Sequence, residues 1–168
     1  MNNSSQGPEL PDACRRRTSG MKVDLDLIAE LSALNVAYWQ DVDHNWGRRA
    51  HEFFVEDNAV YATPGKPLEG REAIRDFYGW REGRGSRVAR HCILNFHAAP
   101  AGPDRAVCNW ILLLHAADGE PILPTAPPIQ IADFHDVCVR GADGVWRYES
   151  RTLTPIFAGG APVTLPPT

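Results

Sequence analysis

Hydrophobic positions recur every three to four residues between residues 24 and 45, which is the period of an amphipathic helix. Asp24 or Asp26 would cap the N-terminus of this helix. The positions that share its apolar face are Leu27, Ile28, Leu31, Leu34, Tyr38 and Val42. A short second helix is predicted over Arg48–Phe54 and a third within residues 71–85, the segment "REAIRDFYGWREGRG". The pattern therefore predicts three helices in the first half of the chain.

The second half of the chain is rich in apolar and β-branched residues in short runs, which is typical of strands. A short strand is expected at Val60 and Tyr61, and the longer ones at Val88–His97, Ala106–His115, Ile129–Arg140 and Val145–Thr154. The segments "PAGPD" and "GADG" predict tight turns, and the proline-rich "ADGEPILPTAPP" a long loop. Helices followed by sequential strands indicate an α+β fold, with the N-terminal helices packed in a curved, mostly antiparallel sheet.

Length and composition indicate one globular domain: the chain has 168 residues, of which 43% are hydrophobic. We expect a disordered leader over residues 1–22, a single domain over 23–157 and an irregular tail over 158–168. The net charge of −4 argues against a nucleic-acid partner. No apolar run is long enough for a membrane span, and the leader lacks the apolar core of a secretory signal. We therefore expect a cytoplasmic protein.

No metal or other cofactor is predicted. The four cysteines, Cys14, Cys92, Cys108 and Cys138, form no C-x-x-C pair and are interpreted as free thiols. The histidines and acids match neither H-E-x-x-H nor a facial triad. An alternative remains in "DFHD", where Asp133 and His135 share a strand face and could line a pocket or pair with His91 on a metal. The cluster of Trp80, Arg81, Arg84 and Arg87 is interpreted as a solvated helix end.

One strand-like segment carries polar groups on a face that is otherwise apolar. In "ARHCILNFHA", side-chain alternation places His91, Ile93 and Asn95 on the same face. An imidazole and a carboxamide beside a buried isoleucine suggest a pocket within an apolar interior.

Four motifs, in this order and spacing, resemble the SnoaL-like branch of the nuclear-transport-factor-2-like superfamily over residues 25–155. They are "VDHNWGRRAHEFFVEDNAVY", "LEGREAIRDFY", "RHCILN" and "DGVWRYESRTLTP". The resemblance implies a cone-shaped α+β barrel with an apolar pocket at its mouth. Within this superfamily the chain is most similar to scytalone dehydratase, bile-acid dehydratase and hexachlorocyclohexane dehydrochlorinase. These enzymes pair an aspartate at the end of the first helix with a histidine on an H-x-x-x-N strand.

The resemblance also assigns candidate site residues. His91 takes the place of the histidine and Asn95 that of the asparagine. Asp43 takes the place of the aspartate if one residue is missing before Gly47, with Asp41 as its competitor. His115 falls near the second histidine of scytalone dehydratase. Further candidates are hydroxyl donors, Tyr38 and Tyr61, and groups that could contact a substrate, Trp39, Trp110, Phe134 and His135.

An aspartate that holds one imidazole nitrogen leaves the other free to remove a proton from carbon. We therefore expect a cofactor-independent lyase of the dehydratase type that acts on a hydrophobic, ring-containing, oxygenated small molecule. The alternatives are an isomerase or polyketide cyclase, or a scaffold like the small subunit of ring-hydroxylating dioxygenases. An epoxide hydrolase would need an Asp-Arg-Asp relay, for which the only candidate residues in the sequence are Arg151 and Asp133. The apolar outer face of the sheet predicts a homodimer or homotrimer.

Overall fold

The computed structural model describes residues 23–159, so most of the predicted leader and tail, and Cys14, lie outside the described residues. The helices are α2 (Leu25–His44), the 3₁₀ helix η1 (Ala50–Phe53) and α3 (Gly70–Glu82). The strands are β1 (Val60–Ala62), β2 (Leu68–Glu69), β3 (Arg87–Gly102), β4 (Arg105–Asp118), β5 (Gln130–Arg140) and β6 (Trp146–Ala158). None of the described helices is long and apolar enough to cross a membrane.

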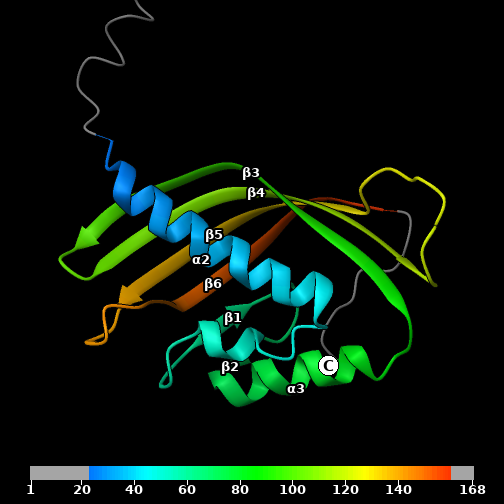
Figure 1. The fold of residues 1–168 in the computed structure, drawn as a ribbon, viewed down its shortest axis with the longest axis horizontal. Helices are drawn as coiled ribbons and strands as arrows, with labels where there is room; N and C mark the ends of the chain where they lie inside the picture. The colour runs from blue at the N-terminus through cyan, green and yellow to red at the C-terminus, as the bar shows by residue number, and fades with distance from the viewer. Residues whose placement is uncertain (1–22, 160–168) are drawn as a thin grey trace, which may run out of the picture.

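The six strands form one curved sheet in the order β2-β1-β6-β5-β4-β3. All neighbouring strands pair antiparallel except β1 and β6, which are parallel to each other. Helix α2 lies across the sheet, and α3 lies beside the short strands β1 and β2 (Figure 1). The predicted α+β architecture, with helices packed in a curved and mostly antiparallel sheet, is confirmed.

Helix α2 begins where the sequence pattern places it. The side chain of Asp24 accepts a hydrogen bond from the backbone N–H of Leu27 at 3.0 Å, so Asp24 is the N-cap residue and not Asp26. Leu31 and Tyr38 on the inner face are 1% and 0% exposed. Burial of this apolar stripe against the sheet holds the helix in place.

Several elements differ in length from their predictions, and three of the differences are informative. The second helix is a single 3₁₀ turn, and β3 continues to Gly102 because the chain reverses at the two residues 103 and 104. Strand β6 continues to Ala158, so the expected boundary of the tail at 158 is one residue too early. The long connection between β4 and β5, residues 119–129, has no helix or strand, as expected.

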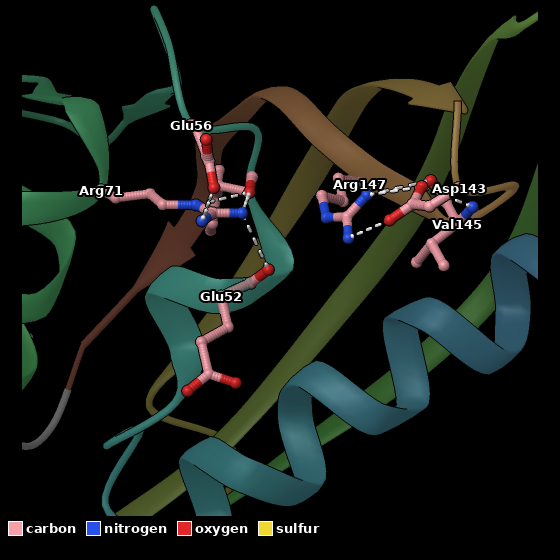
Figure 2. Close-up of polar contacts among 7 residues, drawn as sticks. Glu52, Glu56, Arg71, Asp143, Val145 and Arg147 are labelled. Atoms are coloured by element: carbon pink, nitrogen blue, oxygen red, sulfur yellow. Dashed lines mark hydrogen bonds and ion pairs between the residues drawn. The ribbon is translucent and has the colours of Figure 1, made fainter. Parts of the chain in front are cut away.

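Helix α3 is fixed to η1 by one arginine. Arg71 donates from Nε to the backbone carbonyl of Phe54 at 2.8 Å, and its Nη1 lies 3.3 Å from the carboxylate of Glu56 (Figure 2). The contacts of Arg71 set the position of α3, which supplies part of the wall of the candidate site.

A second ion pair lies at the start of β6. Asp143, in the turn before this strand, pairs with Arg147 on the strand at 2.7 Å, which holds the pKa of Asp143 at about 2 (Figure 2).

Candidate active site

The structure brings Asp43, at the end of α2, against His91 on β3. Oδ1 of Asp43 lies 2.5 Å from Nδ1 of His91, and Oδ2 accepts the backbone N–H of His91 at 2.9 Å. Both side chains are 8% exposed. The aspartate is therefore tied to the strand as well as to the ring, which fixes the imidazole in one orientation.

His91 also stacks on an aromatic ring. The Trp39 ring lies 4.0 Å from the His91 ring, with 16° between their planes. Both residues line a cavity of about 70 Å³. Its other lining residues are Val42, Tyr61, Thr63, Pro64, Phe77, Tyr78, Arg81, Arg87, Leu112, Leu114, Ala116, Gln130 and Leu153. With Nδ1 engaged by Asp43, Nε2 is the nitrogen that remains to meet a ligand.

The surroundings of His91 favour the neutral imidazole. Burial lowers the pKa of His91 below its usual value of about 6.5, and the opposing effect of the Asp43 carboxylate is smaller. The positive charges of Arg81 and Arg151 lower the pKa further. His91 is therefore neutral at pH 7, with a lone pair free to accept a proton.

Two tyrosines line the cavity, Tyr61 on β1 and Tyr78 on α3. Burial raises the pKa of both well above the ordinary value, so both remain hydrogen-bond donors at neutral pH. Tyr38, which the sequence nominates, is fully buried and does not line the cavity. Its hydroxyl lies 2.5 Å from that of Tyr78, so Tyr38 contacts the cavity through Tyr78.

Asp41 has a different role from Asp43. Its carboxylate accepts from Nδ2 of Asn45 at 2.7 Å and from the backbone N–H of Arg49 at 3.0 Å. These bonds close the chain reversal after α2. Asp41 is thus a structural anchor, and the competition between the two acids is resolved in favour of Asp43 as the partner of His91.

The expectation that Asn95 lies beside His91 is wrong. The register between β3 and β4 shifts between Leu94 and His97, and Asn95 adopts a φ of +52° at this bulge. A bulge interrupts side-chain alternation, so Leu94 and Asn95 are both exposed. Asn95 is not among the residues that line the cavity.

Trp110 and Phe134 point inward but do not line the cavity, contrary to expectation. Their rings stack at 4.1 Å on each other, and each meets the Trp39 ring edge-on at about 6 Å. They therefore support the indole that carries His91. Asp133 and His135 alternate with Phe134 and are exposed, so their expected place in a pocket or beside a metal is also wrong.

His115 lies outside the cavity as well. It is exposed on β4, and its Nδ1 lies 3.2 Å from the carbonyl oxygen of Ala126 in the long β4–β5 connection. His115 helps to hold that loop. Among residues 23–159, no group of three or more histidines, cysteines, aspartates or glutamates gathers in a metal-binding arrangement.

Beneath the cavity lies a buried ion pair that the sequence did not predict. Arg151 and Asp136 are 0% and 1% exposed and form two bonds of 2.8 Å. Asp136 also accepts from Nε1 of Trp110, and Asn35 accepts from Nη2 of Arg151 at 2.7 Å. Although burial alone would lower the pKa of Arg151, the charge of Asp136 raises it well above its usual value. Arg151 thus pairs with Asp136 and not with Asp133.

Two cavity residues were also missed from the sequence. Arg81 and Arg87 were interpreted as a solvated helix end, but both line the cavity. Arg87 lies on β3 four residues before His91, and its side chain is 12% exposed. Alternation along the strand, which places residues 87, 89 and 91 on one face, is the signal that could have identified Arg87.

Comparison with solved structures finds the same fold in several proteins. The chain is 18% identical to a candidate scytalone dehydratase from Novosphingobium aromaticivorans, covering 83% of this chain and 91% of that one, with a TM-score of 0.70. ActVI-ORFA from Streptomyces coelicolor is 20% identical over 78% of this chain and 98% of its own, with a TM-score of 0.67.

A protein from Catenulispora acidiphila, solved in complex with S-DNPA, is 23% identical over 79% of this chain and 95% of its own, with a TM-score of 0.65. A comparison with curated protein sequences finds no match. The family model of the SnoaL-like domain matches residues 23–152, which contain α2, all of the cavity-lining residues except Leu153, and most of the sheet. The chain therefore belongs to the SnoaL-like domain family.

Proposed function

We propose that this protein is a cofactor-independent lyase that removes a proton from carbon with His91 and eliminates a group from the neighbouring carbon. The observation that carries the proposal is the contact of 2.5 Å between His91 Nδ1 and Asp43 Oδ1 at the wall of a cavity. Likeness to a candidate scytalone dehydratase supports the same reaction class.

In the proposed reaction, Nε2 of His91 takes a proton from a carbon next to a carbonyl group. The electron pair of the broken C–H bond forms the new C=C bond, and hydroxide departs from the adjacent carbon. Asp43 stabilises the imidazolium that forms. A hydroxyl from Tyr61 or Tyr78 donates a hydrogen bond to the enolate oxygen. The departing hydroxide takes the proton from His91 and leaves as water, which restores the neutral imidazole.

The cavity favours a hydrophobic ring-containing substrate. Apolar side chains form much of its wall, and Trp39 adds a large aromatic side chain. Ligand cavities for drug-sized molecules are several times larger than this one, at roughly 300–1,000 Å³. We therefore expect a substrate with one or two rings, whose entry displaces flexible side chains at the mouth.

A general-base role can be tested before the natural substrate is known. The probe 5-nitrobenzisoxazole releases a coloured cyanophenolate when a base removes its C–H proton and the N–O bond breaks. We expect the wild-type protein to accelerate this reaction, and His91→Gln and Asp43→Asn to lose about 10²–10⁴-fold of the acceleration. Equal rates in His91→Gln and wild type would refute the proposal. Circular dichroism confirms that the variants are folded.

The same first step would serve an isomerase or a polyketide cyclase, where no group departs. Ring-containing β-hydroxy carbonyl compounds distinguish the reactions, because only elimination releases water and adds a C=C bond that ultraviolet absorbance detects. A scaffold without catalysis predicts no acceleration of either kind.

We also propose that the protein self-associates through the outer face of the sheet. Leu94 on β3 and Phe157 on β6 are 44% and 64% exposed. Half-exposed residues of β4 and β5, including Ile111 and Ile131, extend the apolar surface between them. Light scattering that gives a monomer mass at micromolar concentration would contradict this proposal.

A further inference from the structure

We propose that Arg81 and Arg87 form an anion-binding subsite, so that the substrate of the proposed reaction is a ring-containing carboxylic acid. This inference rests on the proposed function, which identifies the reacting end of the substrate. It adds that the other end of the substrate carries a negative charge.

Arg81 and Arg87 lie at the same two hollows of the protein. Both arginines line the cavity that His91 faces. They also line an adjoining hollow of about 30 Å³, together with Arg84 and Asp118. The two arginines thus share both hollows, although one comes from the end of α3 and the other from the start of β3.

Neighbouring acids neutralise the positive charges of Arg81 and Arg87 only in part. Arg87 donates to Asp118 at 2.7 Å from Nη1, but its Nε is buried without a hydrogen-bond partner. Glu82, the acid next to Arg81 in the chain, is engaged by Arg48 instead. Within residues 23–159, no acidic side chain forms an ion pair with Arg81. The subsite therefore keeps a net positive charge and an unused donor.

Arg87 and His91 lie at separate points along the same strand. Four residues along a strand separate the Cα atoms of Arg87 and His91 by about 13 Å. The carboxylate of a substrate that binds Arg87 would therefore lie at a different point along β3 from the carbon that gives its proton to His91. Guanidinium groups bind carboxylates through charge-assisted and often bidentate hydrogen bonds. The arginines are thus placed to orient the substrate and not to touch the reacting carbon.

Matched probes test the subsite without knowledge of the substrate. Benzoate and benzamide have nearly the same shape and differ in charge, and calorimetry measures their binding to the full-length protein. We expect benzoate to bind about tenfold more tightly than benzamide at low salt. Rising ionic strength should reduce this preference.

Variants then locate the preference. Arg81→Gln combined with Arg87→Gln should abolish it, and Arg87→Lys should retain part of it because the charge remains. Arg75→Gln is the matched control, since Arg75 on α3 is exposed, pairs with Glu72 at 3.1 Å and lines neither hollow. The preference of this variant for benzoate should equal that of the wild type.

Three results would overturn the subsite: no preference for benzoate in the wild type, a preference that survives in the double variant, or an equal loss of preference in Arg75→Gln. Failure of the proposed function is recognised separately. His91→Gln should still prefer benzoate while it loses acceleration of the benzisoxazole reaction. Full acceleration in His91→Gln would refute the lyase and leave the benzoate result standing.

Discussion

Asp43 binds His91 through both of its carboxylate oxygens: Oδ1 meets the ring Nδ1 at 2.5 Å, and Oδ2 accepts the backbone N–H at 2.9 Å. A ring held only by its nitrogen can pivot about the bond, whereas here the backbone contact fixes the carboxylate itself. The end of α2 and the middle of β3 are thus joined at the proposed base. The geometry leads to predictions about pH, about the two neighbouring acids and about stability.

The pKa of His91 sets the pH dependence of proton abstraction. Burial lowers this pKa below about 6.5, and only the neutral ring accepts a proton. We expect kcat/KM for the benzisoxazole probe to fall as the pH is lowered, with the midpoint of the fall below about pH 6.5. A midpoint at or above about pH 6.5 would contradict the lowered pKa.

The lowered pKa of His91 also makes the free energy of unfolding depend on pH. The unfolded chain takes up a proton at His91 near pH 6.5, whereas the folded chain does so only at lower pH. Its contribution to stability is therefore present above pH 6.5 and is lost as pH falls through the pKa of the folded state. Urea unfolding of wild type and His91→Gln between pH 5 and 8 should show a smaller loss in the variant.

Mutation should distinguish the roles of Asp41 and Asp43, because one affects stability and the other the reaction rate. Asp41→Ala removes the acceptor for Asn45 and Arg49, which should lower the free energy of unfolding by about 1–2 kcal/mol with little effect on the rate. Asp43→Asn should reduce the rate about 10²-fold or more. Urea unfolding and the benzisoxazole assay measure both effects. If Asp41→Ala lost the rate while remaining folded, the assignment of the two acids would be reversed.

The buried ion pair should be sensitive to the loss of one partner. Arg151→Met leaves the carboxylate of Asp136 buried without its cation, and we expect a loss of about 3–5 kcal/mol in the free energy of unfolding. The double variant Arg151→Met with Asp136→Leu should recover part of that loss, because no charge remains unpaired. Guanidinium unfolding of the three proteins tests this, and a double variant less stable than Arg151→Met would contradict it.

Gly47 is a position where a side chain does not fit. Its φ is +71°, and a Cβ atom there would lie 2.4 Å from Cδ1 of Tyr78. Gly47→Ala should therefore lower the free energy of unfolding by about 1–3 kcal/mol and displace Tyr78 from the cavity wall. Gly79→Ala, in open space on α3, is the matched control and should be neutral or stabilising by up to about 1 kcal/mol. Thermal unfolding measures both.

Much of the fold could be predicted from the sequence because local patterns carry it. The spacing of Leu27, Leu31 and Tyr38 identifies α2, and apolar runs identify the four long strands. Asp43 and His91 could be nominated together because both belong to local motifs. Their contact joins positions 48 residues apart, so only the resemblance to known enzymes suggested the pairing.

The errors have local physical causes. Alternation predicts Asn95 on the face of His91, but a bulge with a positive φ interrupts the alternation at that residue. In "DFHD" the inward face carries Phe134 and Asp136, and the sequence does not reveal that Arg151 neutralises the buried acid. Arg81 and Arg87 look like surface charges until α3 and β3 bring them to the same hollow.

The parallel pairing of β1 with β6 places Tyr61 beside Arg151, although 90 positions separate them in the chain. Strand β1 has only three residues, and its other neighbour is the two-residue β2. During synthesis this wall of the cavity must wait until the last strand has left the ribosome, since contacts between distant segments form late. A nascent chain that stops before residue 150 would lack the residues of β6 with which β1 pairs, and so would lack the strand that carries Tyr61 into the sheet.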